Sequence, residues 1–238
     1  MKRTRGTPVL VAVLFAVGCG EGDGPTAADM RPDVRFVNAT TGSGGGGFTI
    51  NGQFAAGSAL VPGQAMQSCA KFTPGTTVFG FGAANSGGTG LSGNPVVTSN
   101  NENIAGGGKY TVVATGSAAN PTLFVYGTSF SGDLSTSQAA VRFVSLVPPT
   151  GTTVSNYVFY QGAIGATSPL ALGLPFGLTS AYSVVPSGAG TFSAMRTPGN
   201  VILVPSGLVT LQGGSVNTIA LIQNASGGHE LLHIPRCS

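Results

Sequence analysis

The sequence has few charged residues: Asp, Glu, Lys and Arg make up only 7% of its 238 residues. Three of the ten basic residues, Lys2, Arg3 and Arg5, lie within the first five positions. Without those three, seven basic residues remain against seven acidic ones, so the rest of the chain is close to neutral. A neutral chain has no basic patch to neutralise a row of phosphates, so we expect no nucleic acid among its partners.

The sequence also lacks tryptophan, and it has only two histidines and three cysteines. It contains no G-x-S-x-G, P-loop, C-x-x-C or Asp-rich calcium motif. Its acidic residues are scattered, so spacing suggests no carboxylate pair for glycoside hydrolysis. The sequence therefore predicts a protein that is not an enzyme and that uses no cofactor.

No apolar run reaches the roughly 20 residues that a membrane-spanning helix needs. The run from Val9 to Val17 follows a basic start and precedes small residues, which is typical of a signal peptide. Residues 1–18 are therefore predicted to be a signal peptide. Residues 19–32, rich in Gly, Asp and Pro, are predicted to be a flexible tether.

Cys19 lies directly after the expected cleavage site and resembles the lipidated cysteine of the bacterial lipobox. The position at which that family prefers Leu is Ala16 here. The resemblance implies an acylated Cys19 and a lipid anchor in a membrane. Gly20 after this cysteine favours the outer membrane, facing the periplasm or the cell surface. The alternative is an ordinary secretory signal that is followed by a chance cysteine.

The sequence repeats itself once. "DVRFVNATTG" from Asp33 matches "AVRFVSLVPPTG" from Ala140, and "GGGKYTVVATG" from Gly106 matches "QGGSVNTIALIQ" from Gln212. Further pairs of segments keep the same order, so each copy is long enough to be a domain. We predict one domain over residues 33–127, a linker over 128–139 and a second domain over 140–238.

Both copies favour β-strands. Short runs of β-branched and aromatic residues are bounded by Gly or Asn, and no segment sustains a helical apolar period. About seven strands per copy predict an all-β fold of two tandem immunoglobulin-like β-sandwiches. The opening V-R-F-V, the P-x-G turn and the late G-G-x-Y-T-V-V strand resemble a bacterial envelope domain of unknown function. That domain is usually found in tandem, often on lipoproteins, and its resemblance implies a sandwich fold without an established activity.

The pentapeptide "HELLH", from His229 to His233, matches the zinc motif H-E-x-x-H. That motif needs a helix, on which both imidazoles lie on one face. Gly228 directly before it and Pro235 soon after it leave too little length for such a helix. The repeat aligns this segment with the strand-like "PTLFVY" of the first copy, so we predict a strand. His229 and His233 remain only weak metal candidates, and a zinc hydrolase is a remote alternative.

Other residues are candidates for binding or for structure. Tyr157, Phe159 and Tyr160 are candidates for stacking on sugar rings, which is the basis of an alternative function as a carbohydrate- or polymer-binding module. Arg35 and Arg142 occupy equivalent positions in the two V-R-F-V strands, where a salt bridge or a carbonyl contact is the expected role. Asp33 and Asp133 are the candidate acidic partners.

The remaining cysteines, Cys69 and Cys237, belong to different copies. A disulfide between them requires the two domains to lie side by side, because domains stacked end to end would separate these residues too far. Two free thiols or an intermolecular bridge are the alternatives. We expect a non-enzymatic cell-envelope lipoprotein that serves adhesion, binding or envelope structure. Its partners would be the membrane, through the lipid anchor, and another envelope protein or a glycan.

Overall fold

The computed structural model describes residues 30–42, 44–149 and 155–237. Within these residues every helix or strand that is assigned is a β-strand, which confirms the all-β prediction. No helix in this part of the chain is long and apolar enough to cross a membrane. The predicted signal peptide, Cys19 and most of the predicted tether lie outside the described residues.

The strands divide into a first half, β1–β11, and a second half, β12–β19. The first half contains β1 (Asp33–Thr41), β2 (Gly46–Ile50), β3 (Gln53–Phe54), β4 (Gln64–Ala65), β5 (Ala70–Lys71), β6 (Gly75–Thr77), β7 (Phe79–Ala83), β8 (Val97–Thr98), β9 (Glu102–Ile104), β10 (Lys109–Ser117) and β11 (Asn120–Gly127). The second half contains β12 (Gln138–Ser145), β13 (Asn156–Gln161), β14 (Ala171–Pro175), β15 (Ser183–Pro186), β16 (Gly188–Thr197), β17 (Val201–Leu211), β18 (Val216–Gln223) and β19 (His229–Pro235).

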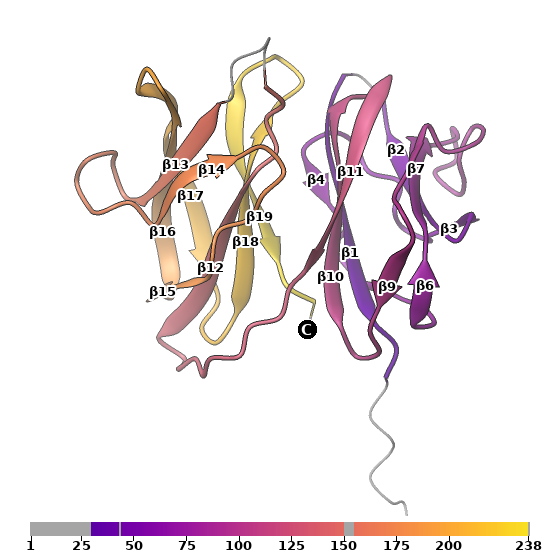
Figure 1. Ribbon diagram of the computed structural model, residues 1–238, viewed down its shortest axis with the longest axis horizontal. Helices are drawn as coiled ribbons and strands as arrows, with labels where there is room; N and C mark the ends of the chain where they lie inside the picture. The colour runs from indigo at the N-terminus through magenta and orange to yellow at the C-terminus, as the bar shows by residue number, and fades with distance from the viewer. Residues whose placement is uncertain (1–29, 43, 150–154, 238) are drawn as a thin grey trace, which may run out of the picture.

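Each half is built from two packed sheets with the same strand order. The first half has an inner sheet, β11-β10-β1-β4, in which β5 also pairs with β1, and an outer sheet, β3-β2-β7-β8, while β6 and β9 form a small separate sheet. The second half has the corresponding inner sheet, β19-β18-β12-β15, and outer sheet, β14-β13-β16-β17. The two halves lie side by side, with their inner sheets facing each other (Figure 1).

The register of the strands also repeats. In the first half β1 runs parallel to β10, with Asp33 opposite Lys109. In the second half β12 runs parallel to β18, with Ala140 opposite Val216. The separation in sequence from Asp33 to Ala140 is the same as that from Lys109 to Val216. The segments that repeat in the sequence therefore lie on strands that correspond in the structure.

This strand order differs from that of an immunoglobulin constant domain. There the first and second strands belong to one four-stranded sheet. Here β12 lies in the inner sheet and β13 in the outer one, and the first strand of each half pairs in parallel with the penultimate strand. The predicted packing of two sheets is present, but the number of strands exceeds seven in each half and their order is different.

A hydrophobic core fills the space between the two sheets of each half. Alternation along β1 sends Val34 and Phe36 into the first core, and alternation along β12 sends Val141 and Phe143 into the second. Phe36 stacks on Phe48 of β2, with ring centroids 4.7 Å apart. Phe143 stacks on Phe159 of β13 at 4.8 Å, so the two halves use the same aromatic packing.

A third hydrophobic cluster, which we call the seam, lies between the two inner sheets. Its buried members are Val37, Ala39, Val113, Val144, Leu146, Ala220, Ile222 and Ile234, with Phe124, Tyr126 and Leu232 packed against them. These side chains lie on the opposite face of each inner sheet from the core of its own half. Both faces of the inner sheets are thus covered, and β1, β12 and β18 are accordingly buried along most of their length.

The seam is self-complementary. Strand register makes Val37 equivalent to Val144 and Val113 equivalent to Ala220. Phe124, opposite Val113, corresponds to Leu232, opposite Ala220. Since equivalent residues of both halves enter one cluster, the halves meet as the two subunits of a two-fold dimer do.

Candidate functional site

The segment HELLH forms strand β19 and not a helix, as predicted. His229 lies opposite Gln223 of β18 and His233 lies opposite Ile219. Four residues of extended strand place their Cα atoms about 13 Å apart. Zinc–nitrogen bonds are about 2 Å long, so the two rings cannot share an ion within one strand. Across the described residues no group of three His, Cys, Asp or Glu side chains is arranged to hold a metal ion.

His233 has a structural contact instead. Its Nε2 atom lies 2.8 Å from Oδ1 of Asn217 on β18. Burial lowers the pKa of His233, and the positive charge of Arg35 lowers it further. The pKa of His229 is lowered by burial and by Arg196. Both shifts favour neutral imidazole rings at neutral pH.

Arg35 holds the chain that leads from β4 to Cys69. Its Nη1 atom donates to the carbonyl oxygens of Met66 and Gln67, the latter at 3.0 Å. Asp33, the candidate partner, pairs with Lys71 at 3.8 Å. Arg35 therefore makes the carbonyl contact that was one of its two expected roles, and it fixes the segment in front of β5.

Arg142, its equivalent in β12, connects the two halves. Its Nη1 atom donates to the carbonyl oxygen of Gly127 at the end of β11, at 2.7 Å, and its Nε atom donates to Thr218 at 3.0 Å. The guanidinium also lies over the rings of Tyr182, at 5.2 Å, and Tyr126, at 5.9 Å. These contacts attach the last strand of the first half to the second half.

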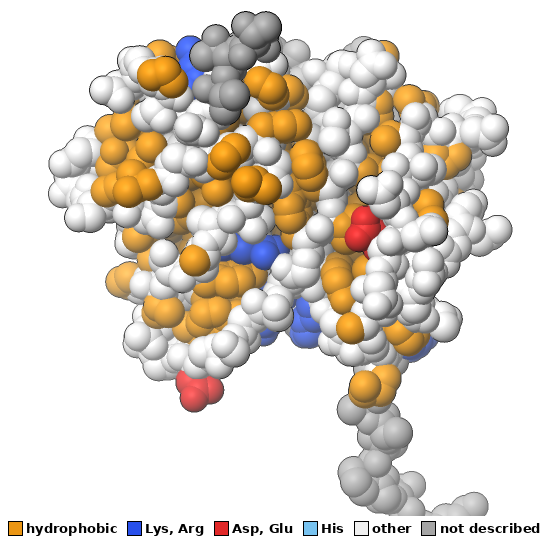
Figure 2. Space-filling view, viewed as in Figure 1, with side chains coloured by type: hydrophobic (Ala, Val, Ile, Leu, Met, Phe, Trp, Pro, Cys, Tyr) orange, Lys and Arg blue, Asp and Glu red, His pale blue; other side chains and the backbone are white. Residues whose placement is uncertain are grey.

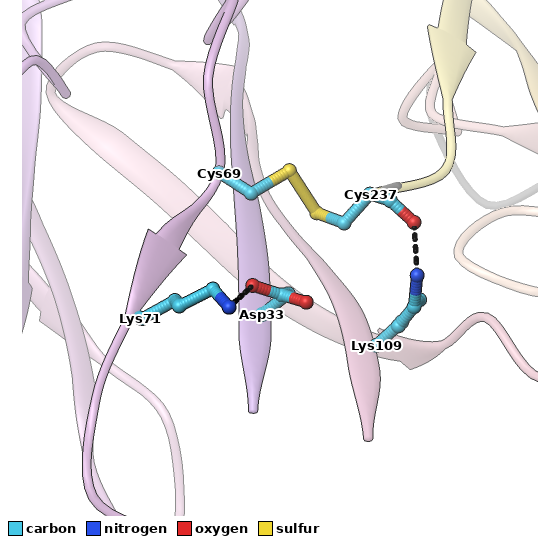
Figure 3. A network of polar contacts seen from close by, with 5 residues as sticks. All are labelled: Asp33, Cys69, Lys71, Lys109 and Cys237. Atoms are coloured by element: carbon cyan, nitrogen blue, oxygen red, sulfur yellow. Dashed lines mark hydrogen bonds and ion pairs between the residues drawn. A yellow bond between two sulfur atoms is a disulfide. The ribbon is translucent and has the colours of Figure 1, made fainter. Parts of the chain in front are cut away.

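A disulfide joins Cys69 and Cys237, whose Cα atoms are 6.0 Å apart (Figure 3). Cys69 lies just before β5, and Cys237 lies two residues beyond β19. Lys109 donates from Nζ to the carbonyl oxygen of Cys237 at 2.7 Å, and the ion pair of Lys71 and Asp33 lies next to the bond. The halves have the side-by-side arrangement that this bond requires. At this end of the seam, a covalent bond and a polar contact tie the C-terminus to the first half.

The three aromatic candidates for sugar binding are not available for stacking, which corrects that prediction. Phe159 is fully buried and Tyr157 is 2% exposed, because both enter the core of the second half. Tyr160 points to the other face of β13 and is still only 9% exposed. Alternation along a strand would by itself bury only some of the three, but both faces of β13 are covered, so no ring is free.

A groove runs along the boundary of the two halves. It encloses about 500 Å³ and is open to solvent. Its lining residues are Gly57, Leu60, Gly63, Gln64, Ala65, Met66, Gln67, Ser68, Leu232 and His233. One wall is the irregular chain around β4, and the other is the C-terminal part of β19. Sequence reasoning missed this groove, because no motif marks either wall and only the packing of the halves brings them together.

The surface is poor in charge and carries exposed apolar side chains. Figure 2 shows hydrophobic side chains gathered over the second half on the face in view. Leu172 and Leu208 are the most exposed large apolar residues of the described chain, at 72% and 73%. Such a surface suits contacts with another macromolecule better than electrostatic capture of a charged one.

Comparison with known proteins identifies a family and no function. No curated protein matches this chain. The model of the family DUF4397, described as a domain of unknown function, matches residues 32–154. This match covers more than half of the chain, including the first half, the linker and β12. The chain therefore belongs to the DUF4397 family, a family defined by a domain of unknown function.

Proposed function

We propose that this protein is a non-enzymatic lipoprotein of the cell envelope, built from two copies of the DUF4397 domain, that serves adhesion, binding or envelope structure. The first copy would extend over residues 33–127 and the second over residues 140–238, with the linker between them. Cys19 would carry the lipid after removal of residues 1–18, and residues 19–32 would tether the domains to the outer membrane.

The observation that best supports two copies is the shared strand order. Both halves have the same two sheets and the same parallel register between the first and penultimate strands. Two unrelated domains would have no reason to share this order. The V-R-F-V segments of β1 and β12 also correspond in sequence.

The contacts of the polar residues favour a binding or structural role over catalysis. Arg35, Arg142, His233 and Lys109 each contact backbone or side-chain atoms that hold strands or halves together. The disulfide adds a covalent link between the same halves. A rigid block of this kind presents its loops and edge strands at fixed positions, as a binding module does.

Metabolic labelling tests the anchor. In a bacterial host fed a palmitate analogue, the wild-type protein should be labelled and should fractionate with the outer membrane. A Cys19→Ala variant should lose the label and appear in the soluble periplasmic fraction or the medium. Label that persists in the variant would contradict lipidation at Cys19, and wild-type protein in the cytoplasm would contradict export.

Cross-linking in intact cells tests the role. A non-enzymatic envelope protein should yield a defined cross-linked envelope protein or peptidoglycan fragment from the wild type. If the exposed apolar side chains of the second half take part in this contact, a Leu172→Ser/Leu208→Ser variant should lose the cross-linked product. The control variant Val96→Ser removes an exposed apolar side chain from the first half and should still give the product. Identical products from both variants would argue against this surface.

A further inference from the structure

We propose that β19 is a self-pairing edge, through which two copies of this chain join by antiparallel β19–β19 pairing centred on Leu231. This goes beyond the proposed function, since it assigns an assembly surface and names its occupant. Strand β19 has free backbone groups along its outer side, whereas the equivalent groups of β11 are protected.

The free backbone groups follow from the ladder between β18 and β19. Just outside the paired residues, the N–H of Arg236 donates to Val216 and the N–H of Asn224 donates to Gly228. Hydrogen-bonded pairs alternate along antiparallel strands, so Glu230, Leu232 and Ile234 bond to β18. The N–H and C=O groups of His229, Leu231 and His233 therefore point away from β18. In the described chain β19 pairs with no other strand.

The equivalent edge strand in the first half, β11, lacks a free hydrogen-bonding group at each of its two ends. Register makes Pro121 the equivalent of His229 and Gly127 the equivalent of Pro235. Pro121 has no N–H to offer a partner strand, and Arg142 occupies the carbonyl oxygen of Gly127. Arg35, the equivalent of Arg142, bonds to Met66 and Gln67 and not to a carbonyl oxygen of β19. Strand β17 lies beside β19 on the core side, where Leu231 packs near Gly207, so a partner strand would enter from the open side of the groove.

The other edge strands carry protection that β19 lacks. The edges β3, β4, β5 and β8 are two residues long, β6 and β9 have three residues each, and β15 has four. The register of β17 is broken twice, and that of β14 is broken once. By contrast, β19 keeps an unbroken register over seven residues. Long, regular, uncovered edges are the ones that pair with other chains.

The sequence of β19 suits pairing with itself. Centred on Leu231, the antiparallel register places His229 opposite His233 of the second copy, with both residues in hydrogen-bonded pairs. Glu230, the one charged residue of the strand, lies opposite Leu232 and not opposite its own copy. Like charges are thus not placed opposite each other, which would destabilise the pair. The groove beside Leu232 and His233 leaves open space next to this edge.

Sedimentation analysis of the soluble chain, residues 20–238, tests the proposal with a matched pair of variants. Wild-type protein should show a reversible monomer–dimer equilibrium. His229→Pro, which copies the residue found at this position in β11, removes one edge N–H per copy. It should weaken the dimer roughly tenfold to a hundredfold, because two hydrogen bonds are lost. His229→Ala keeps the N–H and should dimerise within about threefold of the wild type.

Cysteine cross-linking tests the register independently of affinity. In an antiparallel pair, hydrogen-bonded residues have Cα atoms about 5.5 Å apart, within the range of a disulfide. A mixture of His229→Cys and His233→Cys proteins should form a mixed covalent dimer under mild oxidation, whereas either variant alone should not. A wild type that stays monomeric at all accessible concentrations would overturn the proposal. The proposal would also be overturned if His229→Pro protein dimerised as tightly as the wild type. The same holds if either cysteine variant alone formed the covalent dimer as readily as the mixture.

Discussion

Val37 of β1 and Val144 of β12 occupy equivalent positions in the two halves, and they lie in the same buried cluster. Each has no exposed surface. The seam is therefore formed by a surface meeting its own equivalent, as in a two-fold dimer that has been joined into one chain. It is also a true core, because its residues are as buried as those inside each half. The stability of the whole molecule should depend on it.

Truncation in the seam should be as costly as truncation in a core. Leu146 is fully buried between the halves, so Leu146→Ala should lower the free energy of unfolding by about 2–5 kcal/mol. Leu172, 72% exposed, is the matched control, and Leu172→Ala should change it by less than about 0.5 kcal/mol. Denaturant titration measures both. Equal small effects would mean that the halves do not depend on the seam.

The seam also marks the limit of what the sequence could predict. The short runs of β-branched and aromatic residues predicted strands at β1 and β12. Those runs could not predict that both faces of these strands are buried, because burial of the second face depends on another sheet lying against it. For the same reason Tyr160 was a candidate for binding although it is buried. The strand at HELLH was predictable, since Gly228 and Pro235 act locally on the chain.

The order of the strands was less predictable than their positions. Sequence repeats fix which segments correspond, and the structure places them on corresponding strands. They contain no information about which sheet a strand joins, because a β-branched strand suits either one. The parallel pairing of β1 with β10 joins segments far apart in the chain, and no local pattern reports it. The groove beside β4 has the same origin.

The disulfide should contribute strongly to stability without being required for folding. Cys69 and Cys237 are 168 residues apart, so the bond closes a long loop and stabilises the fold by up to about 5 kcal/mol in the chain-entropy model. A Cys69→Ser/Cys237→Ser variant should be less stable and should still fold, because the seam is independent of the bond.

Peptide mapping and denaturant titration check this prediction. Protein from an oxidising host should yield one peptide pair linked through Cys69 and Cys237, and neither thiol should react with an alkylating agent before reduction. If both thiols are alkylated in folded protein, the bond is absent. If the double variant is unfolded, the seam alone is too weak to hold the halves together.

Arg142 should not be replaceable by lysine. Its guanidinium donates to Gly127 and Thr218 in different directions and lies over two tyrosine rings. An ammonium group cannot reproduce that geometry, so Arg142→Lys should lose the buried hydrogen bond to Thr218 and cost about 1–3 kcal/mol. Arg196→Lys, on a half-buried side chain of β16, should cost less than about 0.5 kcal/mol. Thermal unfolding measures both variants. Equal unfolding temperatures for Arg142→Lys and Arg196→Lys would contradict a role of the Arg142 guanidinium in holding the halves together.

Stability should fall as the pH drops below the ordinary pKa of histidine. Burial lowers the pKa of His233, with a further contribution from Arg35, and burial together with Arg196 lowers that of His229. Above about pH 6.5 both histidines are neutral in the folded and unfolded chains, so they add no pH dependence. Below it the unfolded chain binds protons that the folded chain resists, which favours unfolding until the pH falls through the lowered native pKa values.

The midpoint of urea unfolding should therefore be lower at pH 5.5 than at pH 7.5, a range above the titration of most carboxyl groups. A His229→Gln/His233→Gln variant keeps polar side chains but cannot titrate, so its two midpoints should agree more closely. A wild type that is equally stable at both pH values, or a variant that retains the full difference, would show that these histidines do not carry the effect.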